Sequence, residues 1–276
     1  MRDIAKKKGV EPIAMITAYD TPTARIADEA GVDIILVGDS LGMVVLGLES
    51  TLSVKMDDMI RHTEAVARAK PSALVVGDMP FMSYETDIKE ALHNAGRFLS
   101  AGADAVKIEG GSEYSDVIKA MKRAGIPVMA HVGLTPQKHK LLGGYRLMGK
   151  TASEAFEIIK DAEEVAEAGA FSIVIEFTAW QVAKEVTRRV HVPTICIGSG
   201  PYCDGQVLVI HDILGLSPSI PPFVRKYVDL SEIIKEAVSR YVTDVKKGQL
   251  LAENMYWSMK KGEYEKLREI LEKSKD

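Results

Sequence analysis

Lys107 and Glu109 lie two residues apart in the largely apolar run 105–110, Ala-Val-Lys-Ile-Glu-Gly. The run predicts a β-strand, in which alternate side chains point to the same face. Lys107 and Glu109 therefore share one face, and Val106 and Ile108 fill the other. Buried charges are costly unless they are paired or bound to a metal. The two residues form either a satisfied buried ion pair or the edge of an active site, and we favour the active site.

Carboxylates at the ends of three consecutive predicted strands indicate a metal site. Asp39 follows the second strand, Asp78 ends the third and Glu109 ends the fourth. If these ends meet at one rim, the carboxylates repel one another unless a cation lies between them. Mg²⁺ prefers oxygen ligands and keeps several waters, so a few carboxylates suffice. Each aspartate alone would be a helix cap or a turn residue, and only the joint pattern predicts magnesium.

A further carboxylate, Glu176, ends the sixth predicted strand. It follows an apolar run and precedes Phe177, and burial there would raise its pKa toward the range of a general base. Lys107 suits a substrate carboxylate or a developing oxyanion, and His131 on the fifth strand is another polar candidate. Metal, lysine and base together predict proton removal next to a carbonyl, with the metal chelating a 2-oxo acid and stabilising its enolate. The residues do not identify the electrophile.

The predicted elements that position these residues alternate between strand and helix. Their apolar runs are continuous, which is typical of parallel strands covered on both faces. Gly31, Gly102, Gly125 and Gly169 each join a helix end to the next strand. Recurrence of this joint favours a (β/α)₈ TIM barrel, with an open doubly wound sheet as the alternative. The predicted strands are 13–19, 33–39, 73–78, 105–110, 128–132, 173–177, 194–198 and 207–210.

The pattern changes in the last part of the chain. We predict one barrel domain over 1–276, in which residues 222–276 form a C-terminal helical extension. Amphipathic helices are expected at 230–245 and 250–275. These helices would cover the outer wall of the barrel or contact another subunit.

Composition narrows the class of protein. The chain has 276 residues and a net charge of −4 without a basic block, which argues against a nucleic-acid partner. It has no long apolar run and no signal-peptide pattern, so we expect no membrane partner and a cytoplasmic location. Cys196 and Cys203 are expected to remain thiols in a reducing cytosol.

Six long motifs occur in order between Ile13 and Leu216. They are Thr17-Ala-Tyr-Asp20, Gly38-Asp-Ser-Leu-Gly-Met43, Gly77-Asp-Met-Pro-Phe-Met-Ser-Tyr84, Val106-Lys-Ile-Glu-Gly110, Met129-Ala-His-Val-Gly-Leu-Thr-Pro136 and Cys203-Asp-Gly-Gln-Val-Leu-Val209. This series resembles the ketopantoate hydroxymethyltransferase family. The resemblance implies a magnesium-dependent (β/α)₈ enzyme of pantothenate and coenzyme A synthesis, usually a homodecamer.

The resemblance also implies a ligand set. Asp39, Asp78 and Glu109 match the residues that bind one Mg²⁺ per subunit in that family. Asp39, Ser40, Asp78 and Lys107 match positions that contact the oxo acid.

The implied reaction begins at Glu176, which matches the family's proton acceptor. It removes the C3 proton of 3-methyl-2-oxobutanoate, and the magnesium enolate attacks the one-carbon unit of 5,10-methylenetetrahydrofolate to give 2-dehydropantoate. His131 and Tyr19 are candidates for lining the site, whereas the sequence does not locate the folate.

The chain departs from the family pattern near the rim. Cys196 and Ser199 stand where Gly and Ala are expected, and Phe177-Thr178 follow Glu176 where many members carry other residues. The alternatives are a magnesium-dependent lyase or mutase resembling the phosphoenolpyruvate mutase and isocitrate lyase group, and a catalytically silent barrel. That group commonly carries a catalytic cysteine in a Lys-Cys-Gly-type loop, and neither cysteine here has that context.

Overall fold

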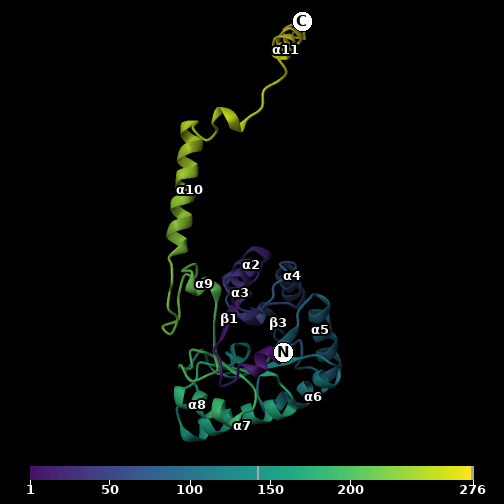
Figure 1. The fold of residues 1–276 in the computed structure, drawn as a ribbon, viewed down its shortest axis with the longest axis vertical. Helices are drawn as coiled ribbons and strands as arrows, with labels where there is room; N and C mark the ends of the chain where they lie inside the picture. Colours follow the sequence, from purple (N-terminus) through teal and green to yellow (C-terminus); the bar gives the residue numbers. More distant parts are fainter. Residues whose placement is uncertain (142, 275–276) are drawn as a thin grey trace. The chain divides into compact units, whose positions relative to one another are not determined.

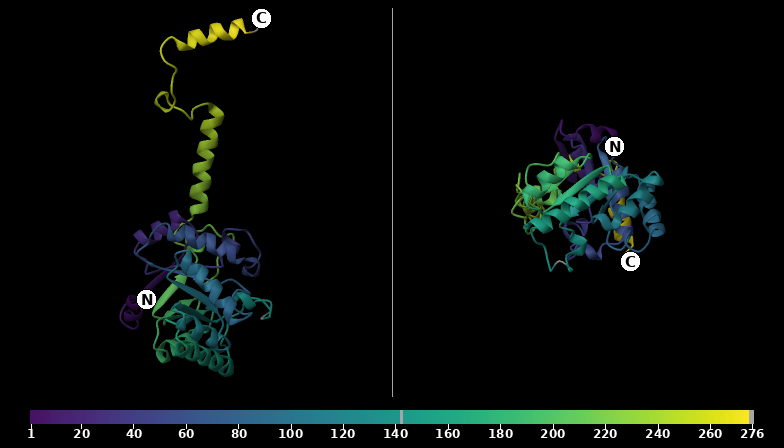
Figure 2. Two further views of the ribbon diagram at one scale, coloured as in Figure 1. Left: turned by 90° about the vertical axis from the view of Figure 1, so that its right-hand side faces the viewer. Right: turned by 90° about the horizontal axis from the view of Figure 1, so that it is seen from below.

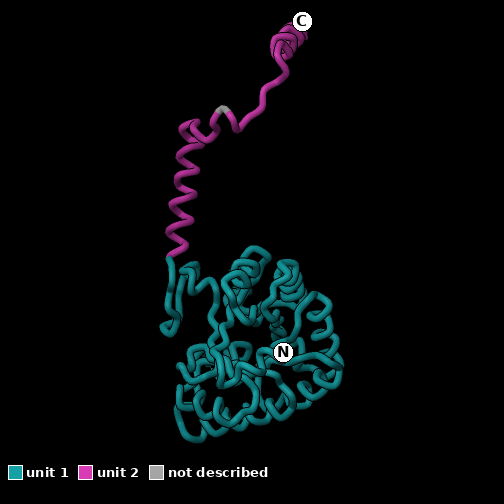
Figure 3. The backbone as a smooth tube through the Cα atoms, viewed as in Figure 1, with its two compact units in different colours: residues 1–228 teal, residues 229–276 magenta. Residues whose placement is uncertain are grey.

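The computed structural model describes residues 1–141 and 143–274. It divides the chain into two compact units, residues 1–228 and residues 229–276 (Figure 3). Unit 2 begins inside the segment 222–276 that was predicted as an extension. The assignment of 1–276 to a single domain stays a prediction.

Unit 1 is a closed barrel of eight parallel strands, each paired with the next in the chain, with β8 paired to β1. This confirms the (β/α)₈ TIM barrel and excludes the open sheet. The strands are β1 (Ile13–Thr17), β2 (Ile34–Val37), β3 (Leu74–Asp78), β4 (Ala105–Glu109), β5 (Val128–Gly133), β6 (Ser172–Glu176), β7 (Thr194–Ile197) and β8 (Gly205–Leu208).

Helices connect the strands and cover them from outside. In unit 1 they are α1 (Arg2–Lys6), α2 (Thr21–Glu29), α3 (Leu41–Val44), α4 (Met56–Ala67), α5 (Ile88–Ser100), α6 (Ser115–Arg123), α7 (Ala152–Ala168), α8 (Trp180–Arg189) and α9 (Ile210–Ile213). Short 3-10 helices lie at Thr51–Ser53, Ser112–Tyr114 and Pro136–Lys138. Helices α4 to α8 pack side by side in chain order around the strands (Figures 1 and 2).

The predicted glycine joints are confirmed, because Gly31, Gly102, Gly125 and Gly169 all have positive φ. The last strand differs from its prediction. β8 begins at Gly205 rather than at 207, since glycine and glutamine weaken the strand pattern in the sequence although they pair with β1 here. Ile210 belongs to α9 instead.

The strands have two different faces, and the difference places the charged pair of β4. Val106 and Ile108 belong to the core between the strands and the surrounding helices. Ala105 belongs to a second core inside the barrel. Because side chains alternate along a strand, Lys107 and Glu109 share the inner face with Ala105, as predicted. The apolar residues of the inner core therefore fill one end of the barrel and leave charged groups at the carboxyl end.

Unit 2 contains α10 (Leu230–Lys247), a 3-10 helix at Glu253–Met255 and α11 (Glu263–Lys273). The predicted helix at 230–245 is confirmed. The single helix predicted over 250–275 is wrong, because Gly262 adopts a left-handed conformation directly before α11; Lys275 lies outside the described residues. Among the residues that the structure describes, no helix is both long and apolar enough to span a membrane.

The two cysteines do not remain thiols. Cys196 of β7 and Cys203 form a disulfide. The turn between β7 and β8 contains Gly198 and Gly200, both with positive φ, and returns the chain so that the two Cα atoms lie 5.6 Å apart. The expectation from a reducing cytosol was therefore wrong, since the sequence spacing alone does not show that this turn brings the cysteines together.

Reduction of this disulfide is expected to lower the free energy of unfolding by about 2 kcal/mol, the loop-closure entropy of a short cross-linked loop. Guanidinium unfolding with and without a phosphine reductant measures the change. The Cys203→Ser variant serves as the control, and reductant should not change its midpoint. Equal midpoints for the wild type under both conditions would show that the cross-link contributes nothing.

Candidate active site

The carboxyl end of the barrel contains a cavity of about 570 Å³. The catalytic and ligand candidates that line it are Asp39, Ser40, Asp78, Lys107, Glu109 and Glu176. Residues remote in the chain therefore converge on one space, as the strand-end pattern predicted.

Strand register explains why these groups meet. Asp78 at the end of β3 is the cross-strand partner of Lys107 on β4. Glu109 is in turn the partner of His131 on β5. The hydrogen-bond ladder of the barrel thus sets charged side chains beside one another on adjacent strands.

Lys107 is the only cation that the described residues place among the carboxylates of this cavity. Its Nζ donates to both carboxylate oxygens of Asp78, at 2.7 and 2.9 Å, and lies 3.8 Å from Glu109. Burial acts to lower the pKa of Lys107, but Asp78, Glu109 and Asp39 outweigh it and raise that pKa. Lys107 is therefore a fixed ammonium at neutral pH.

Asp39 follows β2 and lies beside Asp78, whose Oδ2 accepts a hydrogen bond of 3.2 Å from the Asp39 backbone N–H. Burial, followed by repulsion from Asp78, raises the pKa of Asp39 to about 7. Burial also raises the pKa of Glu109 well above its ordinary value. One ammonium does not balance three buried carboxylates.

This charge imbalance fits a divalent cation. Three ionised carboxylates with one ammonium carry two excess negative charges, and a dication cancels them. Among the described residues, no three acidic, His or Cys groups are arranged as a ligand set for a metal ion. Lys107 donates to both Asp78 oxygens. Mg²⁺ needs only one or two protein carboxylates when water and substrate supply the other oxygens. Asp39 and Asp78 fit that requirement, with Glu109 adjoining them.

Glu176 ends β6, and its side chain is 20% exposed at the cavity. Burial raises its pKa to about 8, while Lys107 acts in the opposite direction. This agrees with the prediction that desolvation would bring Glu176 into the range of a general base. The raised pKa favours a group that accepts a proton and later returns it near neutral pH.

His131 lies between two acidic residues. Its Nδ1 is 3.7 Å from Glu109 and its Nε2 is 3.5 Å from Glu176. Burial lowers the pKa of His131 well below its ordinary value, so the ring is neutral. Neither ring nitrogen has a hydrogen-bond partner among the described residues. His131 is therefore a buried neighbour of the site and is not one of its charges.

Tyr19 lies one layer behind the cavity. Its hydroxyl is 2.9 Å from Oγ of Ser40, and its side chain is buried. The described residues that line the cavity include Ser40 and do not include Tyr19. Tyr19 therefore contacts the site through Ser40, whose hydroxyl it orients.

Gln137 is a residue that sequence reasoning missed. Its side-chain Nε2 donates to Asp39 Oδ2 at 2.9 Å and to the Met79 carbonyl at 3.0 Å. Its backbone N–H donates to Glu109 at 3.0 Å, and its Oε1 accepts from the Tyr84 hydroxyl at 3.0 Å. The only sequence signal was its position directly after the motif that ends at Pro136. Gln137 thus holds two candidate metal ligands in place.

Replacing Gln137 with methionine keeps its length and removes its side-chain hydrogen bonds, including the one to Asp39. We expect Mg²⁺ affinity to fall by about 10- to 100-fold, the usual cost of losing an outer-shell partner of a metal ligand. Calorimetric titration with Mg²⁺ measures the change. The matched control, Gln206→Met, lies in a different cavity and should bind as the wild type. Unchanged affinity in Gln137→Met would contradict the positioning role.

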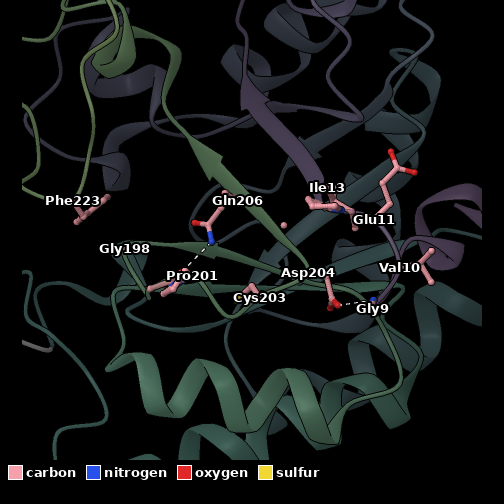
Figure 4. Close-up of a pocket in the computed structure, with 13 residues that line it drawn as sticks. Gly9, Val10, Glu11, Ile13, Gly198, Pro201, Cys203, Asp204, Gln206 and Phe223 are labelled. Atoms are coloured by element: carbon pink, nitrogen blue, oxygen red, sulfur yellow. Dashed lines mark hydrogen bonds between the residues drawn. The ribbon is translucent and has the colours of Figure 1, made fainter.

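That other cavity, about 800 Å³, lies beside the start of β1 and the turn between β7 and β8 (Figure 4). Its polar groups have structural partners. Asp204 accepts from the Gly9 backbone at 3.0 Å and from Lys8 Nζ at 3.1 Å, and Gln206 donates to the Gly200 carbonyl at 3.0 Å. Its larger volume therefore does not indicate the catalytic site.

Solved structures with a similar fold include a phosphoenolpyruvate phosphomutase from Streptomyces platensis subsp. rosaceus. It superposes with a TM-score of 0.61 at 18% identity and covers 99% of this chain and 96% of its own. A 2,3-dimethylmalate lyase superposes with a TM-score of 0.59 at 17% identity over 92% and 91% of the two chains. At these identities the likeness shows the fold alone.

Relatives in sequence are much closer. The chain is 67% identical to a 3-methyl-2-oxobutanoate hydroxymethyltransferase from Hyperthermus butylicus, over 98% of this chain and 94% of that protein. It is 61% identical to the enzyme of that name from Staphylothermus marinus, over 96% and 98%. The family model for ketopantoate hydroxymethyltransferase matches residues 1–251. With a barrel that gathers the motif residues at one rim and with this degree of identity, the chain belongs to the ketopantoate hydroxymethyltransferase family.

Proposed function

We propose that this protein transfers a hydroxymethyl group from 5,10-methylenetetrahydrofolate to 3-methyl-2-oxobutanoate, giving 2-dehydropantoate for pantothenate and coenzyme A synthesis. The observation that carries the proposal is the single cavity where Asp39, Asp78, Glu109 and Lys107 meet a separate carboxylate, Glu176. Its support from outside the structure is the name shared by relatives that are 56–67% identical.

In the proposed first step, Glu176 accepts the proton from C3 of the oxo acid. The electron pair released at C3 forms the new carbon–carbon bond to the one-carbon unit. Water supplies the hydroxyl oxygen, and the carrier leaves as tetrahydrofolate. A partly buried carboxylate with a pKa of about 8 is strong enough to take the proton and is still partly ionised at neutral pH.

The other charged residues of the cavity would bind and orient the oxo acid. Lys107 and Ser40 would contact the oxygens of the oxo acid, and Asp39 and Asp78 would hold Mg²⁺ with Glu109 beside them. A bound Mg²⁺ supplies Lewis acidity that favours negative charge on the 2-oxo oxygen. Asp39, Asp78 and Glu109 fit Mg²⁺ because Lys107 alone leaves their negative charge in excess.

The lyase or mutase alternative shares the fold and the enolate chemistry. It is less well supported, because both cysteines, Cys196 and Cys203, are joined in a disulfide and neither is a free thiol in the structure. The homodecamer and the cytoplasmic location remain predictions, and light scattering of the purified protein measures the first of them.

A direct assay tests the proposed function. Purified protein is mixed with Mg²⁺, 3-methyl-2-oxobutanoate and 5,10-methylenetetrahydrofolate, and 2-dehydropantoate is measured by mass spectrometry. We expect product only when all three are present. Exchange of the C3 proton in deuterated water without product formation would support an enolising lyase or mutase. Binding without exchange would indicate a silent barrel.

The exchange rate should depend on pH through Glu176. A base acts only when ionised, so with a pKa of about 8 its active fraction falls about tenfold for each pH unit below that value. A bound Mg²⁺ nearby would move the midpoint down and not up. Exchange followed by NMR from pH 6 to pH 9.5 measures the profile, with Mg²⁺ saturation checked at each pH. A rate that rises as the pH falls would contradict the assignment, because protonation removes the base.

A further inference from the structure

The cavity has an apolar part that the proton transfer does not use. Residues 219–223, Ser-Ile-Pro-Pro-Phe, follow α9 and line it. Phe223 at the end of this segment lies over Phe177, with ring centroids 5.6 Å apart. Gly198 permits this packing, since a Cβ there would lie 2.9 Å from the Phe223 ring. Two aromatic rings and two prolines therefore form a stiff wall beside the charged groups.

Asp212 is an ionisable residue in the same cavity with no role in the proposed chemistry. It belongs to α9, which follows β8, and it is 7% exposed. Among the described residues, the hydrogen bond to its carboxylate comes from Ser217, a neutral donor. The adjacent His211 is a weak counter-ion, because burial lowers the pKa of its ring, and burial raises the pKa of Asp212 as well. Asp212 is thus a buried carboxylate with acceptor capacity to spare.

The chemistry of these groups selects one kind of ligand. Apolar and aromatic walls favour a flat ring system, and a carboxylate favours an edge that presents two N–H donors side by side. The oxo acid does not fit, because its own carboxylate would be repelled by Asp212. The 2-amino-4-oxopyrimidine edge of a reduced pterin presents such a donor pair, and the fused rings behind it are flat.

We propose that Asp212 binds the pterin edge of the one-carbon carrier, with Phe177, Phe223 and the prolines of 219–223 packing against the rings. This inference rests on the proposed function for the identity of the carrier. It places the donor of the one-carbon unit in the same cavity as Glu176, on residues distinct from those that would hold magnesium and the oxo acid.

The binding of two probes under anaerobic conditions tests the proposal. The probes are tetrahydrofolate and 6-methyltetrahydropterin, and the second lacks the folate tail. Calorimetry on the full chain should show that Asp212→Asn binds both probes about 10- to 100-fold more weakly, the loss of a hydrogen-bonded charge. A tetrahydrofolate analogue without the 2-amino group should bind the wild type more weakly and lose little further affinity in the variant. Ser217→Ala keeps the carboxylate and should retain binding.

The outcomes separate this proposal from the proposed function. Calorimetric binding of 3-methyl-2-oxobutanoate with Mg²⁺ checks that Asp212→Asn is folded. Equal probe affinities for the wild type and Asp212→Asn would overturn the pterin site, as would a wild type that exchanges the C3 proton and binds neither probe. Conversely, Asp212-dependent pterin binding in a wild type that exchanges no proton would support the site and contradict the proposed reaction.

Discussion

Replacing Glu176 with glutamine is expected to slow exchange of the C3 proton of 3-methyl-2-oxobutanoate by about 10²- to 10⁴-fold, the range that general-base catalysis contributes. Glutamine keeps the size of the side chain and cannot accept the proton. Loss of this partly buried carboxylate should not unfold the chain, because the pKa of about 8 means that the carboxyl is already largely neutral at pH 7. NMR exchange in deuterated water with Mg²⁺ gives the rate directly.

Two controls make this result specific. The oxo acid should bind Glu176→Gln with affinity close to that of the wild type in calorimetry, since the orienting groups are intact. Glu185→Gln, an exposed change on α8, should exchange at the wild-type rate. If Glu176→Gln still exchanged the proton at that rate, another group would have to be the base.

Replacing Asp39 and Asp78 together with asparagine is expected to weaken Mg²⁺ binding by more than about 100-fold, beyond the 10- to 100-fold cost of losing an outer-shell partner. Both changes keep the shape of the side chain and remove negative charge where it is concentrated. They also leave Lys107 without its closest carboxylate. Breaking a buried ion pair costs about 3–5 kcal/mol, so thermal unfolding should also occur at a lower temperature.

The single variant Asp39→Asn preserves the ion pair between Lys107 and Asp78 and keeps the test valid if the double variant does not fold. It should still bind Mg²⁺ more weakly than the wild type. Asp116→Asn, a change of an 83% exposed side chain on α6, is the matched control. Calorimetry that showed wild-type Mg²⁺ affinity in Asp39→Asn and in the double variant would exclude these aspartates as the metal site.

The barrel could be predicted from the sequence because the strands of the barrel are buried on both faces. Continuous apolar runs mark such strands, and the positive φ of Gly31, Gly102, Gly125 and Gly169 follows from their positions after helices. The sequence was insufficient where a strand begins at glycine, as β8 does at Gly205, and where Gly262 interrupts an amphipathic pattern. Pairing with β1 at Gly205, and a left-handed backbone at Gly262, outweigh the periodicity of side chains.

The candidate site was predictable where a charged residue interrupts an apolar strand or ends it. Lys107, Glu109 and Glu176 are of this kind. They could be predicted because a charged residue in a buried strand is costly and has few structural explanations. Gln137 and Asp212 are not, since an amide or a carboxylate in a connecting segment is usually exposed. Their burial depends on how the connections fold back over the barrel, which periodicity does not describe.

The register of β4 limits the insertions and deletions that this enzyme tolerates. Its side chains alternate between the inner and outer cores, and Asp78 and His131 on the neighbouring strands are paired with Lys107 and Glu109. Deleting one residue from the first half of β4 would turn the ammonium and the carboxylate out against the helices and bring two apolar side chains in. We therefore expect insertions and deletions in the connecting loops, and new specificity to arise by substitution within a β4 of constant length.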